Sequence, residues 1–237
     1  MTKRLTLATG DSLLIHDQSE SDVISILEMK DYPLNRLSLS NPGGGPIVDI
    51  GAHCGATSFL FSKIFPQAHV YAFEPLSVNL ALARENLNRA NVTLNPFGLG
   101  DTDKTIRIYH SPQFGFAASS SQKTRDHNED FEDVQIKSAY SQLAGLGPIS
   151  ILKIDTEGHE LPIIQSIRPL LPSVSLLFLE VHSDLHRVYL DALLYEQFTL
   201  FFSRSEMAHR YCLAYVNKQA LANGFVQVVV APELRAA

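Results

Sequence analysis

The segment from Ile47 to Gly55 constrains the fold of this chain more than any other. β-Branched residues surround Asp49, a turn with Gly51 and Gly55 follows, and residues 56–65 then favour a helix. Strand, glycine turn and helix in this order form the first half of a βαβ unit. The backbone N–H groups at the start of such a helix can face a bound nucleotide. We therefore expect a ligand site at this turn.

The second half of the unit follows directly. Residues 69–74 form a short apolar run that predicts a strand, and this strand ends in Glu74, 23 residues after Gly51. In a βαβ unit, an acid at this place binds the ribose hydroxyls of a nucleotide. The spacing therefore predicts that Glu74 holds a ribose.

The glycine spacing distinguishes between classes of nucleotide ligand. A dinucleotide-binding turn reads Gly-x-Gly-x-x-Gly, whereas this turn reads Asp49-x-Gly51-x-x-x-Gly55 and has no middle glycine. A carboxylate in the turn disfavours phosphate but suits a ligand that carries ammonium and sulfonium groups. The turn therefore favours S-adenosylmethionine, and an NAD(P)-dependent oxidoreductase on a similar core is the alternative.

The alternation of strand and helix patterns continues along the chain and predicts an α/β, Rossmann-like fold with a mostly parallel sheet and helices on both faces. The remaining predicted strands are 92–97, 105–109, 149–154, 175–181, 197–203, 211–216 and 225–230, and the remaining predicted helices are 76–90 and 185–196. We expect the strand at 225–230 to complete the sheet.

A second group of polar residues follows two of the predicted core strands. Asp155 and Glu157 follow the strand at 149–154, while Glu180 and His182 lie at the end of the strand at 175–181. Open α/β sheets bind ligands at the carboxyl ends of their strands. If the two strands are neighbours, these carboxylates and the imidazole converge at one edge of the sheet.

Five segments resemble, in order, the motifs of FkbM-type S-adenosylmethionine-dependent methyltransferases. The resemblance covers roughly residues 47–182, and its segments are Asp49–Gly55, Tyr71–Pro75, Leu99–Asp101, Leu152–Glu160 and Leu179–His182. It implies a class I methyltransferase fold with an antiparallel strand near the C-terminal end. It also implies methylation of a hydroxyl on a sugar or a secondary metabolite. Two residues depart from the family pattern. The family usually has Asn at the position of His53 and a small residue at the position of His159.

The resemblance assigns cofactor-binding residues as well. Glu74 would hold the ribose, Asp101 the adenine, and Asp49 the turn and the amino-acid end of S-adenosylmethionine. The complete predicted set is Asp49, Gly51, Ala52, His53, Gly55, Glu74, Pro75, Gly100, Asp101 and Asp155.

Transfer of a methyl group to a hydroxyl requires a base, because a neutral hydroxyl is a poor nucleophile. Imidazole is the natural proton acceptor near neutral pH, so we predict His182 as the base, with Asp155 and Glu157 as alternative bases or orienting groups. These residues together with Glu180 could also bind Mg²⁺ or Mn²⁺. They show no diagnostic ligand spacing, and no metal is predicted.

Residues 1–45 precede the predicted methyltransferase domain at 46–237. They predict a hairpin over 5–15, a helix over 23–30 and a flexible joint at Asn41–Pro46. We expect this segment to cap the active site, and the family resemblance places Tyr32 near it. The alternative is that the hairpin lies at the edge of the sheet and has a packing role alone. The polar stretch at 113–133 is either a lid over the ligand or a disordered loop.

Charge and cysteine content limit the partners. The net charge of −6, without a basic cluster, argues against nucleic acid and anionic membranes, and favours a small-molecule or sugar acceptor. No apolar run approaches the ~20 residues that span a bilayer, and the N-terminal residues do not read as a signal peptide. With two cysteines, a reducing cytoplasm is predicted. A non-catalytic protein that binds S-adenosylmethionine remains an alternative, and the oligomeric state is not predicted.

Overall fold

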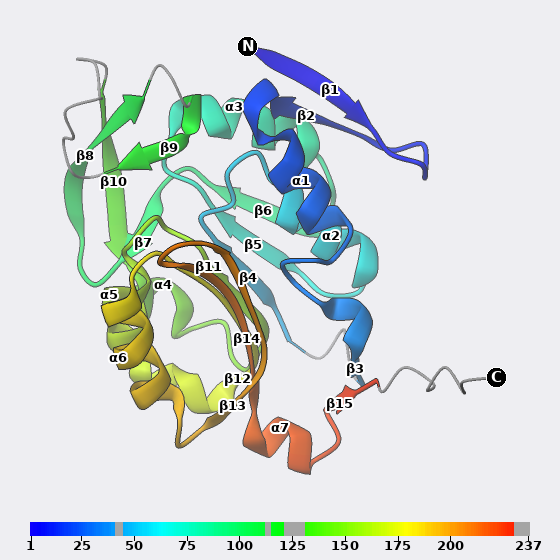
Figure 1. Ribbon diagram of the computed structural model, residues 1–237, viewed down its shortest axis with the longest axis vertical. Helices are drawn as coiled ribbons and strands as arrows, with labels where there is room; N and C mark the ends of the chain where they lie inside the picture. Colours follow the sequence, from blue (N-terminus) through cyan, green and yellow to red (C-terminus); the bar gives the residue numbers. More distant parts are fainter. Residues whose placement is uncertain (41–44, 112–114, 121–130, 230–237) are drawn as a thin grey trace.

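A seven-stranded sheet organises the molecule (Figure 1). The computed structural model describes residues 1–40, 45–111, 115–120 and 131–229. The strand order is β13-β14-β12-β11-β4-β5-β6. The bounds are β4 (Ile47–Ile50), β5 (Val70–Phe73), β6 (Val92–Asn95), β11 (Ile149–Ile154), β12 (Val174–Val181), β13 (Phe198–Met207) and β14 (Arg210–Asn217). Only β14 runs antiparallel to its neighbours, β12 and β13. The predicted fold class is confirmed, and β14 is the predicted antiparallel strand.

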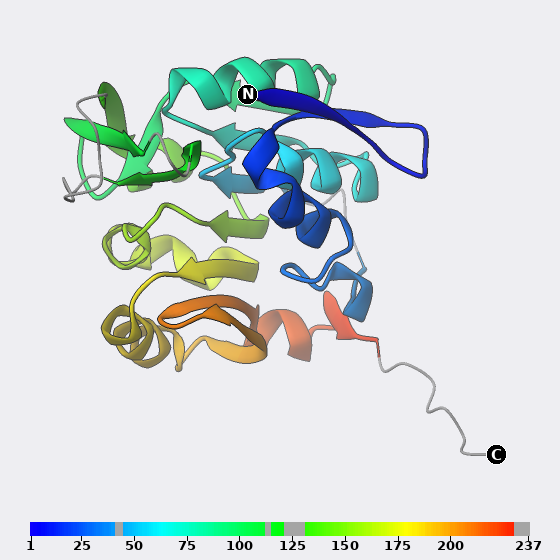
Figure 2. The same cartoon turned by 45° about the horizontal axis from the view of Figure 1, so that its top comes forward.

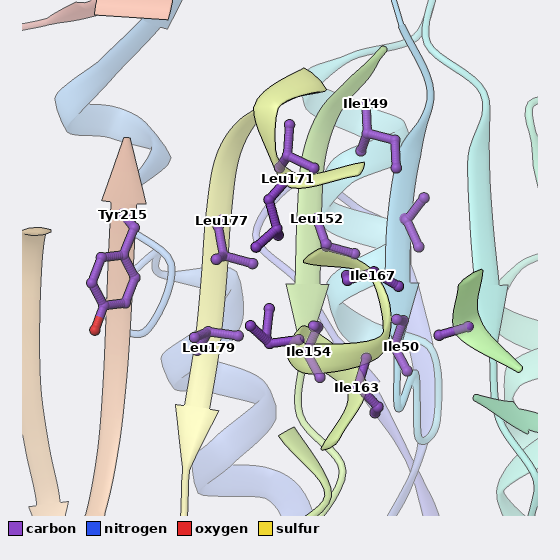
Figure 3. Close-up of a cluster of buried hydrophobic side chains, with 14 of the residues drawn as sticks. Ile50, Ile149, Leu152, Ile154, Ile163, Ile167, Leu171, Leu177, Leu179 and Tyr215 are labelled. Carbon is purple, nitrogen blue, oxygen red and sulfur yellow. The ribbon is translucent and has the colours of Figure 1, made fainter. Parts of the chain in front are cut away.

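Helices cover both faces of this sheet, as Figure 2 shows. One face carries α4 (Ala139–Leu143), α5 (Glu160–Ser166) and α6 (Asp184–Leu194), and the other carries α1 (Glu20–Leu27), α2 (Ala56–Ile64), α3 (Ser77–Asn86) and α7 (Lys218–Ala222). All residues of β4 and β11 are buried, including the polar Asp49, Ser150 and Lys153, so neither strand has a solvent-exposed face. Figure 3 shows Leu152 and Ile154 of β11 packed with Ile163 of α5.

A second, four-stranded sheet lies beside the main sheet (Figure 1). Its order is β7-β10-β8-β9, with β7 (Gly98–Gly100), β8 (Lys104–Ser111), β9 (Gly115–Ser120) and β10 (Phe131–Ser138). Only β8 was predicted. Residues 115–120 and 131–133 of the predicted loop are strands, which corrects that part of the prediction. Residues 113–114 and 121–130 lie outside the described residues. Strand β10 is hard to recognise in sequence because only Val134 and Ile136 are buried, against Leu76.

The N-terminal segment forms a hairpin and also pairs with the last described strand. The N-terminal hairpin pairs β1 (Thr2–Thr6) with β2 (Ser12–His16), which confirms the predicted hairpin, and α1 starts three residues before the predicted helix. Strand β3 (Leu37–Leu39) pairs antiparallel with β15 (Val226–Val228) in a separate sheet. The prediction that the last strand completes the main sheet is therefore wrong, because an apolar strand pattern does not specify the partner strand.

Three 3₁₀ helices complete the described elements: η1 (Asp17–Ser19), η2 (Leu34–Arg36) and η3 (Arg168–Ser173). No helix among residues 1–40, 45–111, 115–120 and 131–229 combines the length and apolar character required to cross a bilayer.

Candidate active site

A cavity lies at the carboxyl ends of β4, β5, β11 and β12, where open α/β sheets bind ligands. Its wall is built from four parts of the chain: the turn after β4, the residues after β5, the residues after β11, and the N-terminal segment. The second sheet adds apolar side chains from β8 and β10. Representative lining residues are Gly51, His53, Glu74, Asp155, Glu157, Tyr32 and Ile136.

The turn after β4 requires glycine at position 51. Gly51 has a φ of +81°, and a Cβ atom there would lie 1.7 Å from the backbone oxygen of Asp155. The N–H groups of Gly51 and Ala52 both donate to the carbonyl oxygen of Phe73 at 3.0 Å. The turn is thereby held between β5 and the end of β11, with its backbone against the cavity.

Lys153 lies at the centre of a buried charge network below this turn. Its side chain is 2% exposed, and its Nζ lies 3.1 Å from Asp49 Oδ1 and 3.6 Å from Asp155 Oδ2. Nζ also donates to the carbonyl oxygen of Gly51 at 2.6 Å, and Ser58 Oγ donates to Asp49 Oδ2 at 2.6 Å. Burial alone would lower the pKa of Lys153, but Asp49 and Asp155 outweigh it and raise that pKa. Asp49 therefore supports the turn from beneath and does not line the cavity.

Glu74 lies at the end of β5, buried but lining the cavity. Its carboxylate accepts hydrogen bonds from the N–H groups of His53 (2.8 Å) and Leu76 (2.9 Å) and from Asn79 Nδ2 (3.2 Å). Asn79 in turn contacts His16 Nε2 at 3.0 Å. Burial, only partly offset by these donors, raises the pKa of Glu74 to about 7.

We expect Glu74 to make the protein less stable as the pH rises from about 4.5 to 7. The ordinary pKa of 4.5 applies to the unfolded chain, whereas the folded value is about 7, so the folded protein binds the proton more tightly. Within this window each pH unit should lower the free energy of unfolding by about 1.4 kcal/mol. Urea unfolding between about pH 5 and 7 should show the wild type losing stability relative to Glu74→Gln. A pH-independent difference between the two proteins would contradict the raised pKa.

His53 lines the cavity. Its backbone is left-handed, with φ at +52°, and its ring centroid lies 5.4 Å from that of His16. Burial, together with the neighbouring His16, lowers the pKa of His53 to about 4. The imidazole is therefore neutral at physiological pH and does not repel a cationic ligand.

His182, which follows β12, lies among three carboxylates. Its Nε2 is 3.2 Å from Glu180 Oε1 and 3.3 Å from Glu157 Oε2, and its Nδ1 is 3.4 Å from Glu160 Oε1. Arg210 forms an ion pair with Glu180. Burial alone would lower the pKa of His182, but the carboxylates outweigh it and raise that pKa to about 11. An imidazole that keeps its proton argues against His182 as the base, and that role stays a prediction.

Most predicted cofactor residues lie at the cavity. Those that line it are Gly51, Ala52, His53, Glu74, Pro75, Gly100 and Asp155, joined by the predicted catalytic residue Glu157. Asp49, Gly55, Asp101 and His182 lie outside the lining. Asp101 is exposed and forms an ion pair with Lys104 at 2.6 Å, so nothing in its geometry favours the predicted contact with adenine.

Sequence reasoning missed residues that are brought to the cavity from distant segments. Asp31 lines it and pairs with Arg204 at 2.5 Å across 173 positions of sequence, and Ile106 and Ile136 enter it from the second sheet. No local pattern could have identified them. Tyr32, 2% exposed, lines the cavity with its ring edge against Phe178. The predicted capping role of residues 1–45 stays a prediction.

Comparisons with known proteins identify the family of this chain. The profile of a family described as "Methyltransferase FkbM domain" matches residues 49–200, more than half of the chain. Hexuronic acid methyltransferase AglP of Haloferax volcanii is 28% identical over 141 residues, 57% of this chain and 55% of that protein. Methyltransferase 1 of Beauveria bassiana is 22% identical over 148 residues, 53% of this chain and 59% of that protein. The chain thus spans little more than half the length of these curated relatives.

A solved structure shows the same fold. The fibrillarin pre-rRNA processing protein of Methanococcus jannaschii superimposes with a TM-score of 0.52 over 92% of this chain and 83% of that chain, at 10% sequence identity. At this level of identity the likeness concerns the fold alone.

Proposed function

Because the chain belongs to the FkbM family of methyltransferases, we propose that it uses S-adenosylmethionine to methylate a hydroxyl group on a sugar or a secondary metabolite. The observation that carries the proposal is one cavity whose lining includes Gly51, Glu74, Asp155 and Glu157 together. Cofactor binding and proton removal thus have candidate groups in one continuous space.

The residues present fit S-adenosylmethionine. When bound, this cofactor supplies a methyl group on a sulfonium, and the C–S bond breaks with its electron pair left on sulfur as the acceptor oxygen bonds to the methyl carbon. Glu74 presents carboxylate oxygens that can accept hydrogen bonds from two ribose hydroxyls. The neutral His53 and the carboxylates of Asp155 and Glu157 in the cavity lining tolerate a cationic ligand. Gly51 keeps the turn free of a side chain.

Two carboxylates of the cavity lining can take the hydroxyl proton. Asp155 and Glu157 line the cavity, and His182 Nε2 lies 3.3 Å from Glu157 Oε2. The name of the Haloferax volcanii relative, a hexuronic acid methyltransferase, supports a sugar as the acceptor. The family match gives no support to the NAD(P)-dependent oxidoreductase alternative. Absence of turnover with every acceptor, despite cofactor binding, would favour the non-catalytic alternative.

Calorimetry and thermal unfolding with S-adenosylhomocysteine test the cofactor. Ligand at about 100 times its dissociation constant should stabilise the protein by roughly 2.7 kcal/mol, with NADH as the negative control. Glu74→Ala should weaken S-adenosylhomocysteine binding by about 1–3 kcal/mol, or about 5–150-fold, because a hydrogen bond to a charged group is lost. Unchanged affinity would remove Glu74 from the ribose site. Stabilisation by NADH alone would overturn the proposed cofactor.

The acceptor is tested by transfer of a labelled methyl group to a panel of neutral hexoses, hexuronic acids and hydroxylated secondary metabolites. We expect the label in an ether-linked methyl group that resists mild base. A base-labile label would indicate methylation of a carboxylate and would contradict the hydroxyl acceptor.

A further inference from the structure

Two adjacent strands bring three metal-ligand side chains together. Strands β11 and β12 are parallel neighbours in which Ile154 is paired with Leu179. Asp155 and Glu157 follow β11, and His182 follows β12. One ligand atom from each of these three residues lies within 4.8 Å of the others. This spacing allows one small ion to contact all three.

His182 can act as a ligand once one ring nitrogen gives up its proton, which a bound metal displaces. Nδ1 faces Glu160, whose side chain is fully buried, while Nε2 faces Glu157 and Glu180. Metal-binding histidines usually direct one nitrogen at the metal while a carboxylate contacts the other. Both ring nitrogens are buried, and among the described residues neither makes a hydrogen bond of acceptable geometry.

Around His182 and Lys153, the carboxylates outnumber the lysine and arginine side chains. Within the described chain, Lys153 pairs with both Asp49 and Asp155, and Arg210 pairs with Glu180. Neither Glu157 nor Glu160 has a lysine or arginine ion pair among the described residues. Glu160 is fully buried, and its Oε2 has no hydrogen-bond partner there. Even with His182 protonated, five carboxylates of the described chain (Asp49, Asp155, Glu157, Glu160 and Glu180) face three cations (Lys153, Arg210 and His182), and a divalent cation would balance the remaining negative charge.

We propose that Asp155, Glu157 and His182 bind a divalent cation, Mg²⁺ or Mn²⁺. Two carboxylates and one imidazole are hard or borderline ligands that suit these ions, and three protein ligands leave coordination positions open. Asp155 and Glu157 line the cavity, so those positions are open to it. A cation there would orient the acceptor hydroxyl and lower its pKa. This catalytic role rests on the proposed methyl transfer, whereas ion binding does not.

Titration with Mn²⁺ alone tests the site. The full chain is stripped with EDTA, dialysed, and titrated while electron paramagnetic resonance reports free Mn²⁺. We expect one bound ion per chain. Glu157→Gln and His182→Gln should each weaken binding at least tenfold. Asp184→Asn is the matched control, because it removes an exposed carboxylate that pairs with His209 outside the cluster, and its Mn²⁺ affinity should equal that of the wild type.

The same samples separate this inference from the proposed function. S-adenosylhomocysteine binding is measured in EDTA, where we expect wild-type affinity in all variants, which also shows that they are folded. No Mn²⁺ binding by the wild type, or equal binding by all four proteins, would overturn the metal site even if S-adenosylhomocysteine binds. Mn²⁺ binding without S-adenosylhomocysteine binding would support the metal site and count against the proposed cofactor.

Discussion

Lys153→Met is expected to lower the free energy of unfolding by about 3–5 kcal/mol, because it leaves buried negative charge without its partner. Lys153 and Asp49 have side chains that are 2% and 0% exposed, and Nζ also satisfies the carbonyl oxygen of Gly51. Methionine fills a similar volume but replaces none of these contacts. For a chain of this length, the loss corresponds to a melting temperature lower by roughly 6–20 °C.

Lys63→Met is the matched control for this prediction. Lys63 pairs with Asp11 at 2.9 Å, but its side chain is 43% exposed, so its loss should cost at most about 1 kcal/mol. The double variant Lys153→Met, Asp49→Asn should recover part of the stability, because it removes the unpaired carboxylate. Equal losses from Lys153→Met and Lys63→Met in urea unfolding would show that the buried network does not stabilise the fold as argued.

Glu157→Gln is expected to lower turnover by about 10²–10⁴-fold, the range for loss of a group that assists proton transfer. Glu157 lines the cavity, contacts His182 at 3.3 Å, and has a left-handed backbone with φ at +54°. Its side chain is 44% exposed, so the substitution should leave the fold intact. Glutamine keeps the size of the side chain but removes the charge that a base or a metal ligand needs.

The measurement is single-turnover methyl transfer at saturating S-adenosylmethionine, once an acceptor is known. Binding of S-adenosylhomocysteine in EDTA should equal that of the wild type, which separates a catalytic loss from a binding loss. Asp184→Asn again serves as the control, and its turnover should be unchanged. Turnover of Glu157→Gln within a few-fold of the wild type would remove Glu157 from the reaction and leave Asp155 as the candidate carboxylate.

Local features of the sequence place Gly51 and Glu74 at the cavity, while their contacts with the cofactor stay a prediction. Gly51 and Glu74 belong to one βαβ unit, and parallel strands place the residues after them at one edge of the sheet. The convergence of Asp155 and His182 depended on β11 and β12 being neighbours, which the structure confirms. The position of Asp101 in a family motif does not bring its side chain to the cavity. The side chain pairs with Lys104 instead and is not part of the cavity lining.

The strand, turn and helix order from β4 to β5, the glycine turn and the carboxylates at strand ends were determined by the sequence alone, since hydrophobic period and backbone freedom act over a few residues. Tertiary structure alone decided that β15 pairs with β3, that the second sheet and Asp31 complete the cavity, and that His182 lies among three carboxylates. These outcomes depend on contacts between residues far apart in the chain. Strand pairing, the burial of side chains and the interactions between charged groups all depend on how close residues lie in space. A local pattern of residues does not specify these distances.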